Sequence, residues 1–141
     1  MAKKKGGGKT QYWLFKSEPT SYSIDDLARD KTTHWDGVRN YQARNNLKEM
    51  KKGDKLLFYH SNVGKEVVGV AKVSKPAFPD PTDEKWIAVE VQPVRKFKKT
   101  VTLADIKANL ALKDIGLVRQ SQLSVIALTK DEFDEVLSMA K

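Results

Sequence analysis

Short β-rich runs, separated by turn and helix-start signals, constrain the fold of this chain most strongly. Runs rich in apolar, β-branched and aromatic residues occupy residues 12–16, 55–60, 66–74, 86–94 and 123–128. Side chains alternate along a strand, and the run at residues 86–94 accordingly alternates between two faces. No regular alternation of strand and long helix is visible. The sequence therefore favours a β-rich domain over a doubly wound parallel sheet.

Helix-start signals lie between these runs. Ser23, Thr102 and Thr129 are each followed within three residues by an acidic side chain, which is the arrangement of an N-terminal cap. Residues 40–50 predict a further helix. Residues 78–83 contain two prolines and predict an irregular loop. Five or six short strands with short helices predict an α+β fold, a small and mostly antiparallel barrel.

Composition excludes several classes of protein. The chain has 141 residues, enough for one domain, with no cysteine and only two histidines, His34 and His60. Disulfides are excluded, and neither a metal nor another cofactor is expected. No apolar run approaches the roughly 20 residues that cross a bilayer, and no secretory signal is visible. We expect no membrane association. The location is expected to be cytoplasmic, nucleoid-associated in a bacterium, or nuclear in a eukaryote.

The positive charge is concentrated at the N-terminus. The formal net charge is +8, whereas residues 11–141 carry 22 basic and 18 acidic side chains. Residues 1–10 are rich in Gly and Lys and are predicted to be a disordered basic tail, with the folded domain over residues 11–141. The tail either keeps the chain soluble or attracts phosphates. The sequence leaves both interpretations open.

Three segments place aromatic rings beside hydrogen-bonding side chains. They are residues 13–19, 35–46 and 58–62. Nothing about residues 35–46 suits an apolar core, because tryptophan and tyrosine are mixed there with arginine, asparagine and glutamine. Flat rings beside amides and guanidinium groups suit a flat, polar, aromatic ligand. A nucleobase is the commonest such ligand.

Individual residues within these segments allow two interpretations. Tryptophan is more often a core residue, but Trp35 stands outside any regular apolar pattern and suits an aromatic wall, where stacking on a base is worth roughly 1–3 kcal/mol. Arg39 and Arg44 can donate in a fork to phosphate. Lys16 and Glu18 are either a surface ion pair or a donor and acceptor at a pocket rim. His60 suits a structural role more often than a catalytic one.

Signals of catalysis are absent. We find no nucleophile–base–acid arrangement, no metal-ligand spacing and no glycine-rich phosphate loop after a strand. The glycines at residues 6–8 lack both the preceding strand and the required spacing. The sequence therefore favours binding over catalysis.

The ordered motifs resemble those of the EVE domain. The resemblance is carried by Tyr-Trp-Leu-Phe-Lys-Ser-Glu-Pro at 12–19, Trp-Asp-Gly-Val-Arg-Asn-Tyr-Gln-Ala-Arg-Asn at 35–45 and Phe-Tyr-His-Ser-Asn at 58–62. It extends over nearly all of the chain after residue 10. The segment at residues 78–86 is shorter than in many members of the family, which puts any contact made by that insertion in doubt.

The resemblance implies a PUA-like fold, which is an α+β fold with a mostly antiparallel pseudo-barrel of five or six strands and short flanking helices. It also implies a non-enzymatic module that reads a modified base, notably modified cytosine in DNA. A modified RNA base is the second possibility, as in the related YTH domains. The implied base-binding side chains are Lys16, Ser17, Glu18, Trp35, Asp36, Tyr59, His60, Ser61 and Asn62. Those implied at the nucleic-acid backbone are Arg39, Asn40 and Arg44.

Two other functions remain open at this point. PUA-like domains of the ASCH type imply an amidohydrolase acting on a modified nucleoside, with Lys16 and Glu18 as the reacting groups. Alternatively, the domain contacts other proteins and its aromatic residues are simply core. Under the base-reading hypothesis we expect a monomer whose partner is DNA or RNA carrying a modified base.

Overall fold

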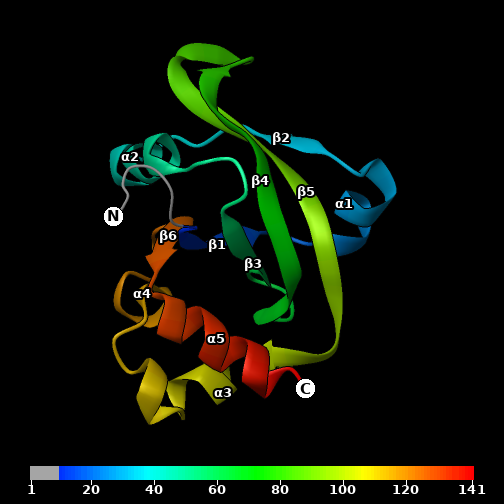
Figure 1. The fold of residues 1–141 in the computed structure, drawn as a ribbon, viewed down its shortest axis with the longest axis vertical. Coiled ribbons are helices and arrows are strands. Elements are labelled where there is room, and N and C mark those ends of the chain that lie inside the picture. Colours follow the sequence, from blue (N-terminus) through cyan, green and yellow to red (C-terminus); the bar gives the residue numbers. More distant parts are fainter. Residues whose placement is uncertain (1–9) are drawn as a thin grey trace.

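The computed structural model describes residues 10–141, and the disordered tail expected over residues 1–10 lies, apart from Thr10, outside them. Six strands are present in this part of the chain: β1 (Tyr12–Ser17), β2 (Thr33–Trp35), β3 (Lys55–His60), β4 (Glu66–Asp80), β5 (Asp83–Thr102) and β6 (Val125–Leu128). They form one mixed sheet in the order β2-β5-β4-β3-β1-β6 (Figure 1). Only β1 and β3 are parallel, and the other neighbouring pairs are antiparallel.

The helices begin where the sequence predicted caps. Ser23, Thr102 and Thr129 each form a complete capping box, and the Asn40 side chain accepts the Ala43 N–H. None of the helices in residues 10–141 is long and apolar enough to cross a membrane. The helices are α1 (Ile24–Asp30), α2 (Tyr41–Glu49), α3 (Leu103–Lys107), the 3-10 turn η1 (Leu110–Leu112), α4 (Gly116–Arg119) and α5 (Lys130–Met139).

The sheet curls without closing. β2 and β6 are its two edge strands and do not pair with each other. The curl still brings Trp35 of β2 against Phe15 of β1, with ring centroids 5.1 Å apart, although the two strands are not neighbours in the sheet. The predicted α+β class with a mostly antiparallel pseudo-barrel is confirmed.

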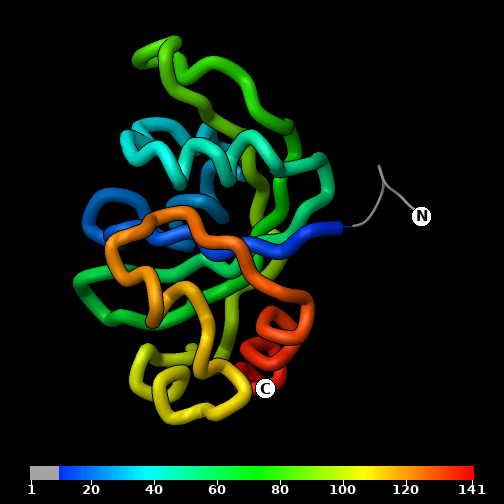
Figure 2. The backbone as a smooth tube through the Cα atoms, turned by 90° about the vertical axis from the view of Figure 1, so that its left-hand side faces the viewer, coloured from blue at the N-terminus to red at the C-terminus, as the bar shows by residue number. Residues whose placement is uncertain are grey.

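The core is centred on the parallel pair β1 and β3. Each strand of this pair contributes two adjacent apolar side chains that are fully buried: Leu14 and Phe15 in β1, and Leu57 and Phe58 in β3. Burying a side chain of this size contributes about 1.5–3 kcal/mol. α3, α4 and α5 gather at the end of the molecule opposite the tip of the β4–β5 hairpin (Figure 1, Figure 2).

Residues 78–83, expected to be an irregular loop, are instead the tip of a long hairpin. β4 continues to Asp80, a two-residue turn follows, and β5 begins at Asp83. β3 pairs with β4 only as far as Lys72, so the outer half of β4 has a free edge. A proline there removes no ladder hydrogen bond on that side. The prediction was wrong because pairing between the two arms of the hairpin overrides a local proline signal.

His60 connects the end of β3 to the start of α1. Its Nε2 accepts the backbone N–H of Ile24 at 3.1 Å, which requires a neutral ring with the proton on Nδ1. Burial lowers the pKa of His60. The sequence-based preference for a structural role over a catalytic one agrees with this position.

This geometry predicts a stability that depends on pH near neutrality. The unfolded chain binds a proton at His60 more readily than the folded chain, so the contribution is present above about pH 6.5 and is lost as the pH falls. We expect the free energy of unfolding, measured by urea denaturation, to fall between about pH 7 and pH 5. His60→Gln should flatten that dependence, whereas His34→Gln, which removes the exposed second histidine, should not. An equal slope in the His60→Gln variant would contradict the assignment.

Candidate functional site

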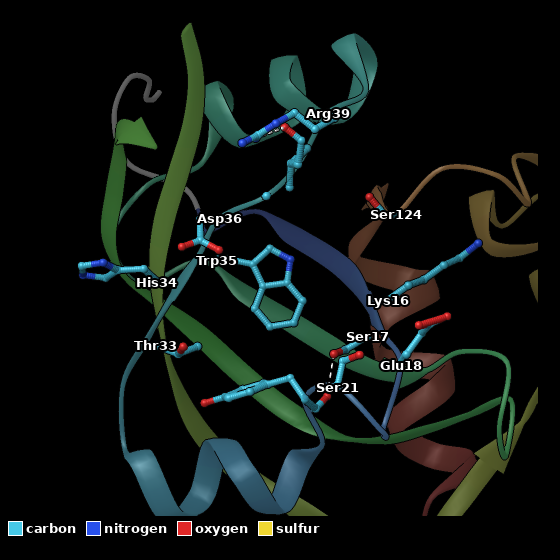
Figure 3. A pocket seen from close by; sticks show the side chains of 13 residues that line it. Lys16, Ser17, Glu18, Ser21, Thr33, His34, Trp35, Asp36, Arg39 and Ser124 are labelled. Carbon is cyan, nitrogen blue, oxygen red and sulfur yellow. Dashed lines mark hydrogen bonds between the residues drawn. The ribbon is translucent and has the colours of Figure 1, made fainter. Parts of the chain in front are cut away.

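A cavity of about 510 Å³ lies where the end of β1 meets β2 and the loop before α2 (Figure 3). We call it the Trp35 cavity. Its volume falls within the range of small-molecule sites, about 300–1,000 Å³. Among the described residues no group of three His, Cys, Asp or Glu side chains could hold a metal ion. The side chains that line the cavity are Lys16, Ser17, Glu18, Ser21, Tyr22, Thr33, His34, Trp35, Asp36, Val38, Arg39 and Ser124.

Trp35 is partly buried and lies between the core and the cavity. Its ring is tilted against Phe15 and meets Phe58 edge-on, with the Phe58 centroid 5.6 Å away. Tyr22 meets the ring edge-on at 6.4 Å. Figure 3 shows the indole projecting into the cavity, with Ser17 and Ser21 on one side and Arg39 on the other. The ring is therefore supported by aromatic neighbours without being enclosed by them.

A buried carboxylate fixes the loop that follows Trp35. Asp80, at the hairpin tip, is 2% exposed. Its Oδ2 accepts the Gly37 N–H at 2.8 Å and an Arg39 Nη1–H at 3.0 Å. Its Oδ1 accepts the backbone N–H of Thr82 at 2.7 Å and the Thr82 hydroxyl at 2.5 Å. These bonds join the hairpin to the wall of the Trp35 cavity.

The electrostatics of this contact favour the charged form of Asp80. Burial by itself would raise the pKa of Asp80, but the hydrogen bonds from Thr82, Gly37 and Arg39 outweigh burial and hold the pKa well below its usual range. Gly37 has a φ of 77°, a backbone conformation that residues with a Cβ rarely adopt. Glycine there lets the backbone N–H turn toward the carboxylate.

The side chains at the end of β1 are already engaged with their neighbours. Lys16 Nζ donates to the carbonyl of Ser121, and the Glu18 carboxylate accepts from the Asn62 amide. The Ser17 hydroxyl donates to the Tyr22 carbonyl. Burial lowers the pKa of Lys16. In Figure 3 the Lys16 and Glu18 side chains line the cavity but point away from the indole of Trp35.

Four of the residues implied to bind the base, those at positions 59–62, do not line the Trp35 cavity. Tyr59, Ser61 and Asn62 line a separate cavity of about 570 Å³, which shares Lys16, Glu18 and Ser124 with the Trp35 cavity. His60 lines neither of these two cavities. Strand alternation explains the separation.

Phe58 faces the ring of Trp35, and the next residue along β3, Tyr59, must point to the other face of the strand. Tyr59 is 4% exposed there, and burial raises its pKa. The structure therefore brings Lys16, Ser17, Glu18, Trp35 and Asp36 together at one cavity and leaves the third segment outside it.

The three residues expected at a nucleic-acid backbone have different surroundings. Arg39 lines the Trp35 cavity and is paired with Asp80. Asn40 uses its side-chain oxygen to cap α2. Arg44 lies outside the cavity, with its guanidinium carbon 5.9 Å from the ring centroid of Trp86.

Sequence reasoning missed several side chains at this site. Ser21, Thr33 and Ser124 were not predicted as site residues and reach the cavity only through the fold. Asp80 did carry a sequence signal. In turns, an aspartate side chain commonly accepts the backbone N–H of the residue two positions further along the chain. The Asp80 Oδ1 bond to the Thr82 N–H forms that turn.

The fold and the cavity together define the class of protein. A YTH domain of Zygosaccharomyces rouxii, solved with N6-methyladenosine RNA, covers 94% of this chain and 87% of its own, with a TM-score of 0.62 at 14% identity. At that identity the likeness shows the fold alone, a PUA-like and YTH-like α+β domain. The EVE domain model matches residues 11–139. The chain belongs to the EVE domain family.

Several relatives are much closer in sequence. Thymocyte nuclear protein 1 of Mus musculus is 41% identical, over 96% of this chain and 76% of its own. A solved protein of Agrobacterium tumefaciens is 44% identical, with a TM-score of 0.89 and 93% of each chain covered. The human THYN1 protein, solved in complex with 5-methylcytosine containing DNA, is 37% identical, with a TM-score of 0.88, over 94% of this chain and 98% of that chain.

The curated relatives contain residues that this chain lacks. The alignment with the mouse protein spans 173 positions, more than the 141 residues of this chain. The relative therefore has additional residues within the matched region. That these residues fall at positions equivalent to 78–86 stays a prediction.

The contacts of Asp80 predict a large effect from a small substitution. Asp80→Asn removes the charge and turns one acceptor oxygen into a donor that faces other donors. We expect the free energy of unfolding, measured by urea denaturation near pH 7, to fall by about 2–3 kcal/mol. Asp83→Asn changes an exposed carboxylate at the same hairpin and should alter stability by less than about 0.5 kcal/mol.

The stability difference between the original chain and Asp80→Asn should depend on pH. Because the pKa of Asp80 is depressed, its contribution is present above about pH 4 and is lost as the pH falls further. The stability difference between the original chain and Asp80→Asn should therefore narrow below about pH 4. Equal stability of the two proteins at neutral pH would show that Asp80 does not fix the hairpin.

Proposed function

We propose that this chain is a non-enzymatic nucleic-acid-binding protein that reads a modified base extruded into the Trp35 cavity. The observation that carries the proposal is the partly buried indole beside an open cavity. The human THYN1 protein, a structural relative at 37% identity, was solved with 5-methylcytosine containing DNA. Modified cytosine in DNA is therefore the preferred ligand, and a modified RNA base is the second.

The chemistry of the cavity suits an amino-bearing base. Trp35 offers a flat ring for stacking, which is worth roughly 1–3 kcal/mol per base. Asp36 is exposed beside it, and its carboxylate, when ionised, only accepts hydrogen bonds. Cytosine presents an exocyclic amine that donates to such a group, whereas thymine presents a carbonyl at that position. In this proposal Trp35 supplies the stacking and Asp36 contributes selectivity for cytosine.

The energetics require further contacts. Extruding a base from a duplex costs a few kcal/mol, which one aromatic stack roughly offsets. Most of the affinity must then come from phosphate contacts, and binding should weaken as salt is added. In this proposal the protein binds as a monomer. The cytoplasmic location stays a prediction.

The amidohydrolase alternative has one observation in its favour. Burial lowers the pKa of Lys16, as a nucleophilic amine would require. However, Lys16 donates to the Ser121 carbonyl and Glu18 accepts from Asn62, so both groups are held away from Trp35. We therefore propose binding without turnover. Conversion of acylated cytidine by the protein, abolished by Lys16→Ala, would overturn this proposal.

The base-reading proposal predicts a loss of discrimination when the indole is removed. Trp35→Ala should weaken binding of a 5-methylcytosine oligonucleotide by about tenfold to a hundredfold, because the stack is lost. The ratio of affinities for methylated and unmethylated oligonucleotides should approach one. Fluorescence anisotropy with a labelled oligonucleotide measures both quantities. Trp35→Phe keeps a ring and should retain part of the preference.

Stability measurements separate this proposal from the view that Trp35 is only a core residue. If it were only core, Trp35→Ala would lower the melting temperature and leave the binding preference of the folded fraction unchanged. That outcome would contradict base reading at this cavity.

A further inference from the structure

A second aromatic cluster lies beside the Trp35 cavity. Tyr41, the first residue of α2, contacts Trp86 near the hairpin tip of β5, with ring centroids 5.1 Å apart and planes tilted by 31°. The Tyr41 side chain is 69% exposed, which is unusual for a large aromatic residue. Together with Arg39 and Arg44, these two residues form what we call the Tyr41 platform.

Both arginines of the platform lie against its rings. The guanidinium carbon of Arg44 is 5.6 Å from the centroid of Tyr41, and that of Arg39 is 5.5 Å from the centroid of Trp86. Such distances are those of cation–π contacts. The platform therefore combines planar rings with planar cations.

The charge of Arg44 is not balanced within the described part of the chain. Arg39 is paired with Asp80, whereas Arg44 forms no salt bridge to any residue in 10–141. The only hydrogen bond of its side chain to residues 10–141 is a long one, 3.5 Å from Nη1 to the Lys85 carbonyl, and its Nε is buried without a partner. The terminal N–H groups of Arg44, which form no other hydrogen bond to the described residues, can donate to an anionic group at this surface.

The platform is continuous with the Trp35 cavity. Arg39 lines the cavity and also contacts Trp86. The chain runs from Trp35 to Tyr41 through a single short loop, which Asp80 fixes at Gly37 and Arg39. Figure 3 shows Arg39 at the side of the cavity from which α2 begins. A strand whose base enters the cavity would therefore pass the platform with an adjacent nucleotide.

We propose that the Tyr41 platform binds the nucleotide next to the extruded base on the same strand. Tyr41 stacks on that unpaired base, and Arg44 binds its phosphate. Stacking on aromatic and arginine side chains tolerates any base, so the platform adds affinity without sequence preference. The inference rests on the proposed function, because it assigns the neighbour of the base in the Trp35 cavity. The exposed ring of Tyr41 and the unbalanced positive charge of Arg44 favour a nucleic-acid strand over an apolar protein segment.

The test uses single-stranded oligonucleotides with one 5-methylcytosine or one cytosine at the centre. 2-Aminopurine, whose fluorescence changes on stacking, occupies either the 5′ or the 3′ neighbouring position. We expect the protein to change this fluorescence at one of the two positions. Tyr41→Leu should remove the change, and Tyr41→Phe, which keeps the ring, should preserve it.

Affinities measured on the same oligonucleotides give the second readout. Tyr41→Leu should weaken binding of the methylated and unmethylated oligonucleotides by the same factor, about tenfold, leaving their ratio unchanged. Arg44→Gln should weaken both equally and reduce the salt dependence of binding by about one counterion. Binding of free 5-methylcytidine should be unaffected by either substitution.

A matched control addresses stability. Leu110 is 85% exposed in η1, at the other end of the molecule, and Leu110→Ala should change neither the fluorescence nor the affinity. Because Tyr41 is exposed, its variants should melt within a few degrees of the original chain. Equal affinity and fluorescence for Tyr41→Leu and the original chain would overturn the platform.

The outcomes distinguish the two proposals. One outcome is that the protein discriminates methylated from unmethylated oligonucleotides and Tyr41→Leu has no effect. That outcome overturns the platform proposal and leaves the base-reading proposal in place. A Tyr41 effect without discrimination overturns base reading, and with it the assignment of the platform to the neighbour of a modified base, and leaves Tyr41 as a general contact to single strands. Failure of every oligonucleotide to bind overturns both.

Discussion

The buried carboxylate of Asp80 is the interaction on which the candidate site depends. It joins the tip of a long hairpin to the loop after Trp35 through bonds to Gly37 and Arg39. Beyond Val89, which pairs with Trp35 of β2, the hairpin pairs with no third strand in residues 10–141. This contact and the packing of Trp86 on Tyr41 hold the hairpin tip against α2. A buried carboxylate that accepts four hydrogen bonds is costly to desolvate, and removing any of its donors would leave a buried charge incompletely paired. The contact therefore favours a single geometry. The position of Arg39, shared by the cavity and the Tyr41 platform, follows from it.

The open edge of the sheet explains why the cavity lies where it does. β2 has only three residues, and its Trp35 pairs with Val89 while turning its ring inward. The curled sheet brings that ring onto Phe15 and Phe58 of the central strands. A closed barrel would fill this interior with side chains. An incomplete barrel leaves space beside a tryptophan that is already held in place by aromatic neighbours.

Local signals in the sequence predicted the parts of the fold that local interactions determine. The capping boxes at Ser23, Thr102 and Thr129 were predictable because each involves residues three apart. The hairpin tip was not, because its strands are stabilised by pairing across the turn. Of its two prolines, Pro79 lies where β4 has a free edge and Pro81 lies in the turn. At the site, the sequence was sufficient to place residues 13–19 beside residues 35–46. Strand alternation could already have separated Tyr59 from Trp35, whereas the role of Asp80 emerges only when the hairpin meets the loop.

The proposed mode of binding divides affinity from selectivity. Stacking in the Trp35 cavity offsets the cost of extruding a base and leaves little surplus, so the cavity alone can distinguish bases but cannot hold a strand tightly. Residues 11–141 carry only a small excess of positive charge, 22 basic against 18 acidic side chains. Affinity must therefore come from a few well-placed contacts rather than from a general basic surface. As proposed, a platform of rings and arginines next to the cavity would meet that requirement, because it would add binding energy for any sequence and leave the reading of the modified base to Trp35 and Asp36.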